Sequence, residues 1–200
     1  MKRLHRPDLF CWSVFDESRN LDFHSLLWVR AGGNVVIDPL PLSPHDRKHL
    51  DEVGGVGLVL VTNSDHTRNA EWMARTFDAR LAGPRAERDD FPLRCDLWLD
   101  DGDTPVPGLR VLALDGSKTP GELAFVLDGT TLVTGDLIRA HEGGRLTTLP
   151  APKLRDAAAA ARSVRRLAAL PGIEAVLVGD GWPIFRGGGD ALRELAEGLG

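Results

Sequence analysis

The chain has 200 residues, which is enough for one α/β domain that buries about 70% of its unfolded surface. A hydrophobic content of 42% and a charged content of 26% are ordinary for a globular protein, and the formal net charge of −5 argues against nucleic acid as a partner. No apolar run is long enough to cross a bilayer, no Lys/Arg block suggests a membrane surface, and the N-terminal stretch lacks the apolar core of a signal peptide. We therefore expect a cytoplasmic protein, with Cys11 and Cys95 as reduced thiols.

Short runs of β-branched residues and leucines predict the strands, and polar turn residues separate these runs. The predicted strands cover residues 9–15, 23–29, 34–38, 57–62, 110–115, 123–127, 131–136 and 175–180. The segment AFVLDGTTLV is the clearest hairpin signal, because Asp128-Gly129 between two apolar runs favours a two-residue turn.

Helices are predicted from caps, breakers and apolar residues at helical spacing. Ser43 can cap a helix that starts at Pro44, and Asp46 completes a capping box. An alanine-rich helix stops at Pro171-Gly172, a pair that breaks helices. The other two predicted helices run over residues 65–77 and 189–199. Hairpins mixed with strand–helix units favour a sandwich of sheets flanked by helices over a uniform doubly wound sheet.

Several predicted strands end on an aspartate. Ligand sites in α/β folds lie at the carboxyl ends of strands, so acids repeated at this position indicate a site. Carboxylates that lie close together repel each other and need a cation among them. Arg68 and Lys118 are the nearby protein cations, and a divalent metal is the other option. The strand-end aspartates are Asp38, Asp65, Asp115, Asp136 and Asp180.

Four motifs in this order resemble those of the metallo-β-lactamase superfamily over nearly the whole chain: LVLVTNSDHTR, LDGSKTPGE, LVTGD and VLVGDGWPI. The resemblance implies one domain over residues 1–200 with an αββα sandwich of two mixed β-sheets flanked by helices. It also places Asp38 near the site, since NVVIDP is similar to a family strand that ends in aspartate. The framework matches are Thr62, Thr119-Pro120-Gly121, Thr134-Gly135-Asp136, Gly179 and Gly181.

The departures from the family pattern fall on its metal ligands. In the ungapped register, one ligand position is unchanged: Asp136, which bridges two metals in the family. The other motif positions hold residues of different chemistry, namely Asn63, Asp65, Thr67, Arg68, Lys118 and Asp180.

These departures predict that a Lys/Arg–Asp cluster replaces the metal centre. A divalent ion ~4 Å from Lys118 faces roughly 8 kcal/mol of repulsion at an effective dielectric of about 20. The predicted catalytic residues are Lys118, Asp136 and His66, and we expect no cofactor. The predicted role is binding of a small-molecule ligand or metal-free hydrolysis. The remaining predicted pocket residues are Asp38, Asn63, Asp65, Arg68, Asp115, Asp180 and Trp182.

An alternative remains, in which the chain is a metal-dependent hydrolase of a small ester, thioester or phosphoester. Its zinc, manganese or magnesium would be held by Asp65, His66, Asp136 and Asp180. The resemblance puts Trp182 at the rim of the pocket, where it stacks a substrate or covers the loop. His141, in a glycine-rich turn, is expected to be a surface residue. Sequence alone leaves the oligomeric state open.

Overall fold

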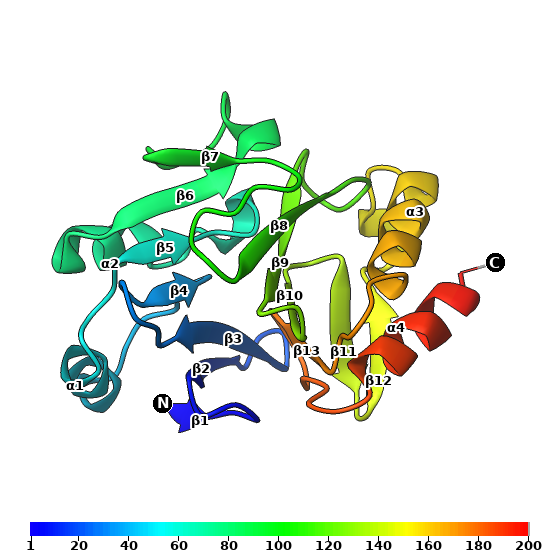
Figure 1. The fold of residues 1–200 in the computed structure, drawn as a ribbon. Helices are drawn as coiled ribbons and strands as arrows, with labels where there is room; N and C mark the ends of the chain where they lie inside the picture. The colour runs from blue at the N-terminus through cyan, green and yellow to red at the C-terminus, as the bar shows by residue number, and fades with distance from the viewer. Residues whose placement is uncertain (200) are drawn as a thin grey trace. The chain divides into compact units, whose positions relative to one another are not determined.

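The structure, a computed structural model, describes residues 1–199 (Figure 1). These residues form two compact units. The first unit comprises residues 1–83 and 88–98, and the second comprises residues 84–87 and 99–199. In the described part of the chain, no helix is both long and apolar enough to cross a membrane. The single domain expected over residues 1–200 stays a prediction.

The first unit is built on a mixed seven-stranded sheet whose strand order follows the chain. Strands β1 to β4 pair antiparallel, whereas β4, β5 and β6 pair in parallel. Helices α1 (Pro44–Glu52) and α2 (Ala70–Phe77) bury Leu50 and Met73 in the apolar cluster of this sheet. The strands are β1 (Lys2–Arg3), β2 (Leu9–Asp16), β3 (Leu21–Trp28), β4 (Val35–Ile37), β5 (Leu58–Leu60), β6 (Arg80–Pro84) and β7 (Leu97–Leu99).

The start of α1 confirms the predicted cap, and the start of α2 corrects a prediction. The Ser43 side chain accepts a hydrogen bond from the backbone N–H of Asp46. In place of one helix over residues 65–77, a 3-10 turn at Ser64–His66 precedes α2. Arg68 has a φ of +36°, a left-handed conformation that no α-helix continues through. The predicted helix is therefore interrupted before α2.

The second unit is built on a mixed four-stranded sheet of order β13-β10-β9-β8, with a separate β11–β12 hairpin. Helices α3 (Ala157–Ala168) and α4 (Gly188–Glu197) lie side by side and bury Val164 and Leu192 in the core of this unit (Figure 1). The strands are β8 (Leu109–Leu114), β9 (Glu122–Leu127), β10 (Thr131–Thr134), β11 (Ile138–Glu142), β12 (Arg145–Thr148) and β13 (Ala175–Val178).

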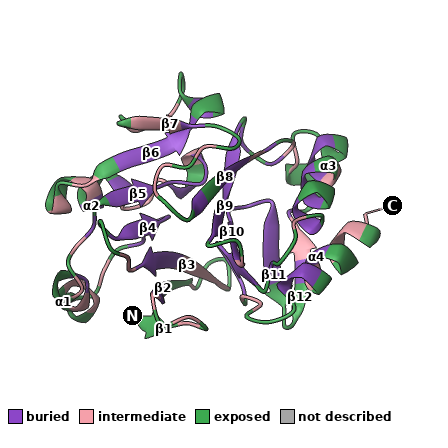
Figure 2. Cartoon of the chain, in the orientation of Figure 1, coloured by how far each residue is buried: buried purple, intermediate pink, exposed green. Residues whose placement is uncertain are grey.

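The predicted turn between β9 and β10 is confirmed. These strands pair antiparallel, and the two turn residues Asp128 and Gly129 have φ values of +48° and +72°. Both strands are buried along their whole length, as Figure 2 shows. Type I′ turns require positive φ at both central residues, and the Thr130 backbone N–H closes this turn by donating to the Leu127 carbonyl at 3.2 Å. This requirement explains why Asp-Gly identified the hairpin from the sequence.

Several short strands lie outside the predicted ones: β1, β6, β7, β11 and β12. β6 contains Gly83 and Pro84, which have little strand propensity. It is a strand because it pairs in parallel with β5. The predicted fold class is nevertheless confirmed, since both units combine a mixed sheet with helices packed on it.

The two cysteines are free thiols of intermediate burial. Burial and the neighbouring Asp96 carboxylate raise the pKa of Cys95 from 9.0 to about 12. We expect alkylation of Cys95 by iodoacetamide at pH 8 to be about a thousandfold slower in the folded protein than in urea, and to accelerate as the pH rises toward 12. Mass spectrometry of timed reactions measures this rate, and an equal rate in both states would contradict the raised pKa.

Candidate functional site

Asp38, Thr62 and His66 form a buried hydrogen-bonded network in the first unit. Asp38 directly follows β4, Thr62 follows β5, and His66 ends the 3-10 turn. The Asp38 carboxylate accepts hydrogen bonds from the Thr62 backbone N–H at 2.8 Å and from its hydroxyl at 2.7 Å. His66 Nδ1 lies 2.8 Å from Asp38 Oδ2, and the exposed fractions of Asp38 and His66 are 3% and 5%. The structure thus places Asp38 in contact with Thr62 and His66, and their membership of one functional site stays a prediction.

The backbone around Asp38 is held in an unusual conformation. Asp38 has a φ of +48°, a region that aspartate tolerates better than most residues. Its carbonyl oxygen accepts a hydrogen bond from the Ser25 hydroxyl at 2.6 Å, and that hydroxyl also accepts the Leu40 backbone N–H at 2.7 Å. These contacts from β3 hold the turn that aims the carboxylate at Thr62 and His66.

Arg68, Asn63 and Asp65 surround this network in different ways. The Arg68 guanidinium donates to the carbonyl oxygen of His24 at 3.0 Å and lies 5.2 Å from the centre of the Phe23 ring. Asn63 is fully buried, and its side chain accepts the backbone N–H of Asp65, which is itself exposed. Arg68 thus donates hydrogen bonds to backbone carbonyl oxygens, and Asn63 caps the 3-10 turn.

A second buried cluster, in the second unit, joins Asp136, Arg139 and Asp180. A guanidinium nitrogen of Arg139 contacts Asp180 Oδ2 and lies 4.0 Å from Asp136 Oδ1. His141 Nε2 lies 3.2 Å from the other oxygen of Asp180. The exposed fractions of Asp136, Arg139 and Asp180 are 7%, 8% and 3%. Because arginine stays protonated, a positive charge lies between these two buried carboxylates and offsets their mutual repulsion.

Arg139 was missed by the sequence analysis, which gave this role to Lys118 and Arg68. Lys118 is exposed, between the buried residues Ser117 and Thr119, and its pairing with Asp136 or Asp180 stays a prediction. A signal for Arg139 was present, because it lies only three residues after Asp136. His141 is exposed as predicted, but its ring nitrogen contacts Asp180 rather than only solvent.

The loop after β13 packs closely against β11. The Trp182 backbone N–H donates to the Ala140 carbonyl at 2.7 Å. Gly181 has a φ of +88°, and a Cβ atom there would lie 2.3 Å from the same carbonyl oxygen. Only glycine allows the loop backbone to come this close to the Ala140 carbonyl. The close packing at Gly181 brings the neighbouring Asp180 into contact with Arg139 and His141.

Glu122, which the sequence analysis did not single out, connects two of the motif loops. It is 1% exposed, and its carboxylate accepts the Ser117 hydroxyl at 2.5 Å and the Leu137 backbone N–H at 2.9 Å. Those partners are the immediate neighbours of Lys118 and Asp136. A buried carboxylate with several donors fixes its surroundings strongly, and so positions both predicted catalytic residues.

Asp115 is exposed, in contrast to the other strand-end acids of the second unit. Its backbone N–H and carbonyl both bind the Ser163 hydroxyl of α3, at 2.9 and 3.0 Å. This aspartate therefore ends a strand against a helix. Its place in the predicted pocket stays a prediction.

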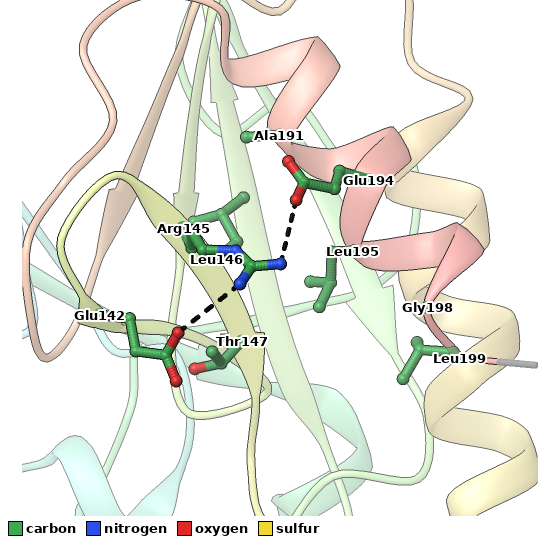
Figure 3. A pocket seen from close by; sticks show the side chains of 9 residues that line it. All are labelled: Glu142, Arg145, Leu146, Thr147, Ala191, Glu194, Leu195, Gly198 and Leu199. Atoms are coloured by element: carbon green, nitrogen blue, oxygen red, sulfur yellow. Dashed lines mark hydrogen bonds and ion pairs between the residues drawn. The ribbon is translucent and has the colours of Figure 1, made fainter.

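A surface pocket of about 280 Å³ lies between the β11–β12 hairpin and α4 (Figure 3). Figure 3 shows Arg145 between Glu142 and Glu194, to which its guanidinium nitrogens lie at 4.0 and 3.1 Å. These three side chains are 63 to 66% exposed, so the ion pairs are of the weak surface kind. None of the predicted site residues lines this pocket.

The motif loops, as far as the structure describes them, do not carry a donor set that fits the family's metal. Among residues 1–199, no group of three or more histidine, cysteine, aspartate or glutamate side chains is arranged to hold a metal ion. The Asp180 carboxylate accepts a guanidinium and so already has a protein partner. Arginine cannot be deprotonated in proteins and offers no lone pair to a metal.

Comparison with known proteins places this framework in a family. Residues 1–199 match the metallo-beta-lactamase superfamily. A hydroxyacylglutathione hydrolase from Ectopseudomonas mendocina (strain ymp) is 32% identical over 151 residues, which are 74% of this chain and 48% of that protein. The chain thus spans about half the length of this relative.

Solved structures show the same fold at lower identity. A metallo-beta-lactamase from Pontibacter korlensis superposes with a TM-score of 0.76 at 16% identity, covering 97% of this chain and 95% of that one. A metallo-beta-lactamase family protein from Thermus thermophilus gives 0.72 at 21% identity, covering 97% and 78%. The framework motifs, the mixed sheets and these matches agree, and the chain belongs to the metallo-beta-lactamase superfamily.

Proposed function

We propose that this chain is a metal-independent member of its superfamily that binds a small-molecule ligand beside the Asp136–Arg139–Asp180 cluster. The observation that carries the proposal is the contact between the Arg139 guanidinium and the buried Asp180 carboxylate. The guanidinium supplies the positive charge that a metal ion would otherwise bring to these acids.

The electrostatic cost of adding a metal supports this assignment. A divalent ion ~4 Å from a guanidinium is repelled by roughly 8 kcal/mol at an effective dielectric of about 20. The ion would also have to displace Arg139 from Asp180 and leave a buried charge without its partner, which is a further cost. A metal therefore competes poorly for these carboxylates in the wild-type chain.

Metal analysis tests the proposal. The protein purified without chelator is expected to contain substoichiometric zinc, manganese and iron by mass spectrometry. Arg139→His removes the repelling charge and supplies a neutral ligand, so zinc affinity in equilibrium dialysis is expected to rise by at least about tenfold. Arg139→Gln, which removes the same charge without supplying an imidazole ligand, is the matched control and should bind zinc more weakly than Arg139→His.

The metal-dependent alternative predicts the opposite results. One equivalent or more of metal in the wild-type protein, with hydrolysis of an ester, thioester or phosphoester abolished by chelation, would establish it. Asp65, His66, Asp136 and Asp180 would then be the residues to substitute.

Metal-free hydrolysis is the second candidate function, and the Asp38–His66 contact favours it. A carboxylate that accepts Nδ1–H fixes the tautomer of the ring and leaves Nε2 as the proton acceptor, which is the arrangement of an oriented general base. In such a reaction His66 takes a proton from the attacking water and returns it to the leaving group. The 32% identical relative is a hydrolase, which supports hydrolysis as the reaction class.

Hydrolysis of thioester substrates by the full chain, in the presence of chelator, tests this second function. Loss of turnover in His66→Gln, in a variant that circular dichroism shows to be folded at the assay temperature, is the expected result. Activity that survives in this variant would remove His66 from the mechanism.

A further inference from the structure

A serine and a histidine lie opposite each other on the β2–β3 hairpin of the first unit. The strand register pairs Ser13 with His24, and the Ser13 hydroxyl oxygen lies 2.8 Å from His24 Nδ1. Residues directly opposite each other in an antiparallel pair share one face of the sheet, so the backbone register brings these two side chains together. A hydroxyl within hydrogen-bond reach of an imidazole is the pairing through which a serine nucleophile is activated.

Small molecules can reach this pair from solvent. Ser13 is exposed and His24 is half-buried. In the described residues, β1 pairs with β2 no further than Cys11, and β4 pairs with β3 from Leu26 onward. The pair therefore lies on the part of the hairpin that extends beyond its neighbouring strands, and a substrate needs no opening of the core to contact it.

The backbone of β2 supplies a third group beside this pair. The Val29 backbone N–H donates to the Asp8 carbonyl, which makes residues 8 and 29 a hydrogen-bonded pair. Such pairs alternate along an antiparallel ladder, so Ser13 and His24 form a non-hydrogen-bonded pair, in which side chains lie closer and the N–H of Ser13 points away from β3. This N–H lies beside its own hydroxyl, at the edge that β1 leaves uncovered. Serine proteases use the N–H of the nucleophilic serine in this way, as one donor of the oxyanion hole.

Neighbouring residues hold the histidine and offer apolar contact. The carbonyl oxygen of His24 accepts a hydrogen bond from the Arg68 guanidinium at 3.0 Å, and this guanidinium lies 5.2 Å from the centre of the Phe23 ring. These contacts fix the segment of β3 that carries the imidazole. Phe15 lies two residues after Ser13, hence on the same face of the hairpin, and is 52% exposed. Its ring can contact the apolar part of an ester bound at Ser13.

We propose that Ser13 and His24 form a nucleophile–base pair that accepts acyl groups from activated esters, an activity separate from the function proposed above. The Ser13 Oγ attacks the carbonyl carbon of the ester while its proton moves to His24 Nδ1, and the Ser13 N–H donates to the oxyanion. The carbon–oxygen bond to the leaving group then breaks, and the leaving alkoxide or phenolate takes the proton from His24. Water attacks the acyl-serine in the same manner, which releases a carboxylic acid and restores both side chains.

Acetylation of the intact protein by p-nitrophenyl acetate, stopped with acid at timed intervals, tests the proposal. Trypsin releases Ser13 and Ser18 together on the peptide of residues 4–19, so fragment masses compare both serines in one sample. Ser18 is also exposed, but its hydroxyl donates to the Asp16 carboxylate at 2.6 Å, and this hydrogen bond holds the pKa of that carboxyl below its usual value. Asp16 is therefore too weak a base to activate Ser18. We expect the acetyl group to accumulate on Ser13 at least about tenfold faster than on Ser18.

Two histidine substitutions separate base catalysis from mere exposure of the serine. His24→Gln keeps a hydrogen-bonding side chain beside Ser13 but cannot take its proton, so Ser13 acetylation is expected to slow about a hundredfold. His45→Gln, at an exposed histidine of α1, should leave this rate unchanged. Equal acetylation of Ser13 and Ser18 in the wild-type protein, or an unchanged rate in His24→Gln, would overturn the proposal. The measured acetyl group is on Ser13 itself, and zinc uptake by Arg139→His does not depend on it, so failure here is distinct from failure of the proposed function.

Discussion

Arg139→Ala is expected to lower the free energy of unfolding by about 3–5 kcal/mol, because it leaves the buried Asp180 carboxylate without its guanidinium and removes a cation that lies 4.0 Å from Asp136. The loss follows from the desolvated carboxylates that remain rather than from the strength of the original ion pair. Urea denaturation followed by circular dichroism measures the change, with the slope m checked for two-state behaviour.

Arg145→Ala is the matched control for this substitution. Arg145 lies on the same hairpin and also pairs with two carboxylates, but its side chain is 63% exposed. Exposed ion pairs contribute about 0–1 kcal/mol, so the two variants should differ by several kcal/mol. Similar losses in both would show that the Asp136–Arg139–Asp180 cluster is solvated, and would remove the basis for placing the guanidinium in the role of a metal.

Asp38→Ala is expected to destabilise the protein by about 3–5 kcal/mol. The substitution leaves the Thr62 N–H and His66 Nδ1 without their acceptor in a buried site. It also places alanine at a φ of +48°, a left-handed conformation that costs about 1–2 kcal/mol. Thermal and urea unfolding of the variant measure the sum of these effects.

Two further substitutions separate the hydrogen bonds from the backbone strain. Asp128→Ala introduces alanine at the same φ of +48° on an exposed turn, where the backbone strain costs about 1–2 kcal/mol. Asp38→Asn tolerates the backbone conformation but retains only one acceptor oxygen, and should fall between wild type and Asp38→Ala. If Asp38→Ala cost no more than Asp128→Ala, the buried network would contribute nothing measurable to stability.

The framework contacts of the two clusters do not depend on a metal ion. Thr62 and Asp38 bond each other, and the loop that contains Gly181 packs onto β11. These contacts depend on backbone geometry and hydrogen bonding. In the function proposed above, Arg139 supplies the positive charge beside Asp136 and Asp180.

Local signals in the sequence were sufficient where the structure depends on neighbours along the chain. The Ser43 cap, the Asp128-Gly129 turn and the breaker after α3 act through contacts a few residues apart. The helix predicted from residue 65 failed because Arg68 has a positive φ, which propensities do not encode. His66 was expected near the start of a helix, and only the structure showed its bond to Asp38, 28 residues away.

By itself, the sequence determined the superfamily and the mixed sheets with flanking helices, since motif order and apolar patterns are properties of the chain. Only the tertiary structure decided that the Arg139 guanidinium contacts Asp180. Arg139 is 41 residues from this partner, and the two meet because the loop after β13 lies on β11. Lys118, which the sequence favoured for this role, is exposed, and its pairing with Asp136 or Asp180 stays a prediction. The contact between Arg139 and Asp180 depends on burial and direction, which arise only when distant strands pack.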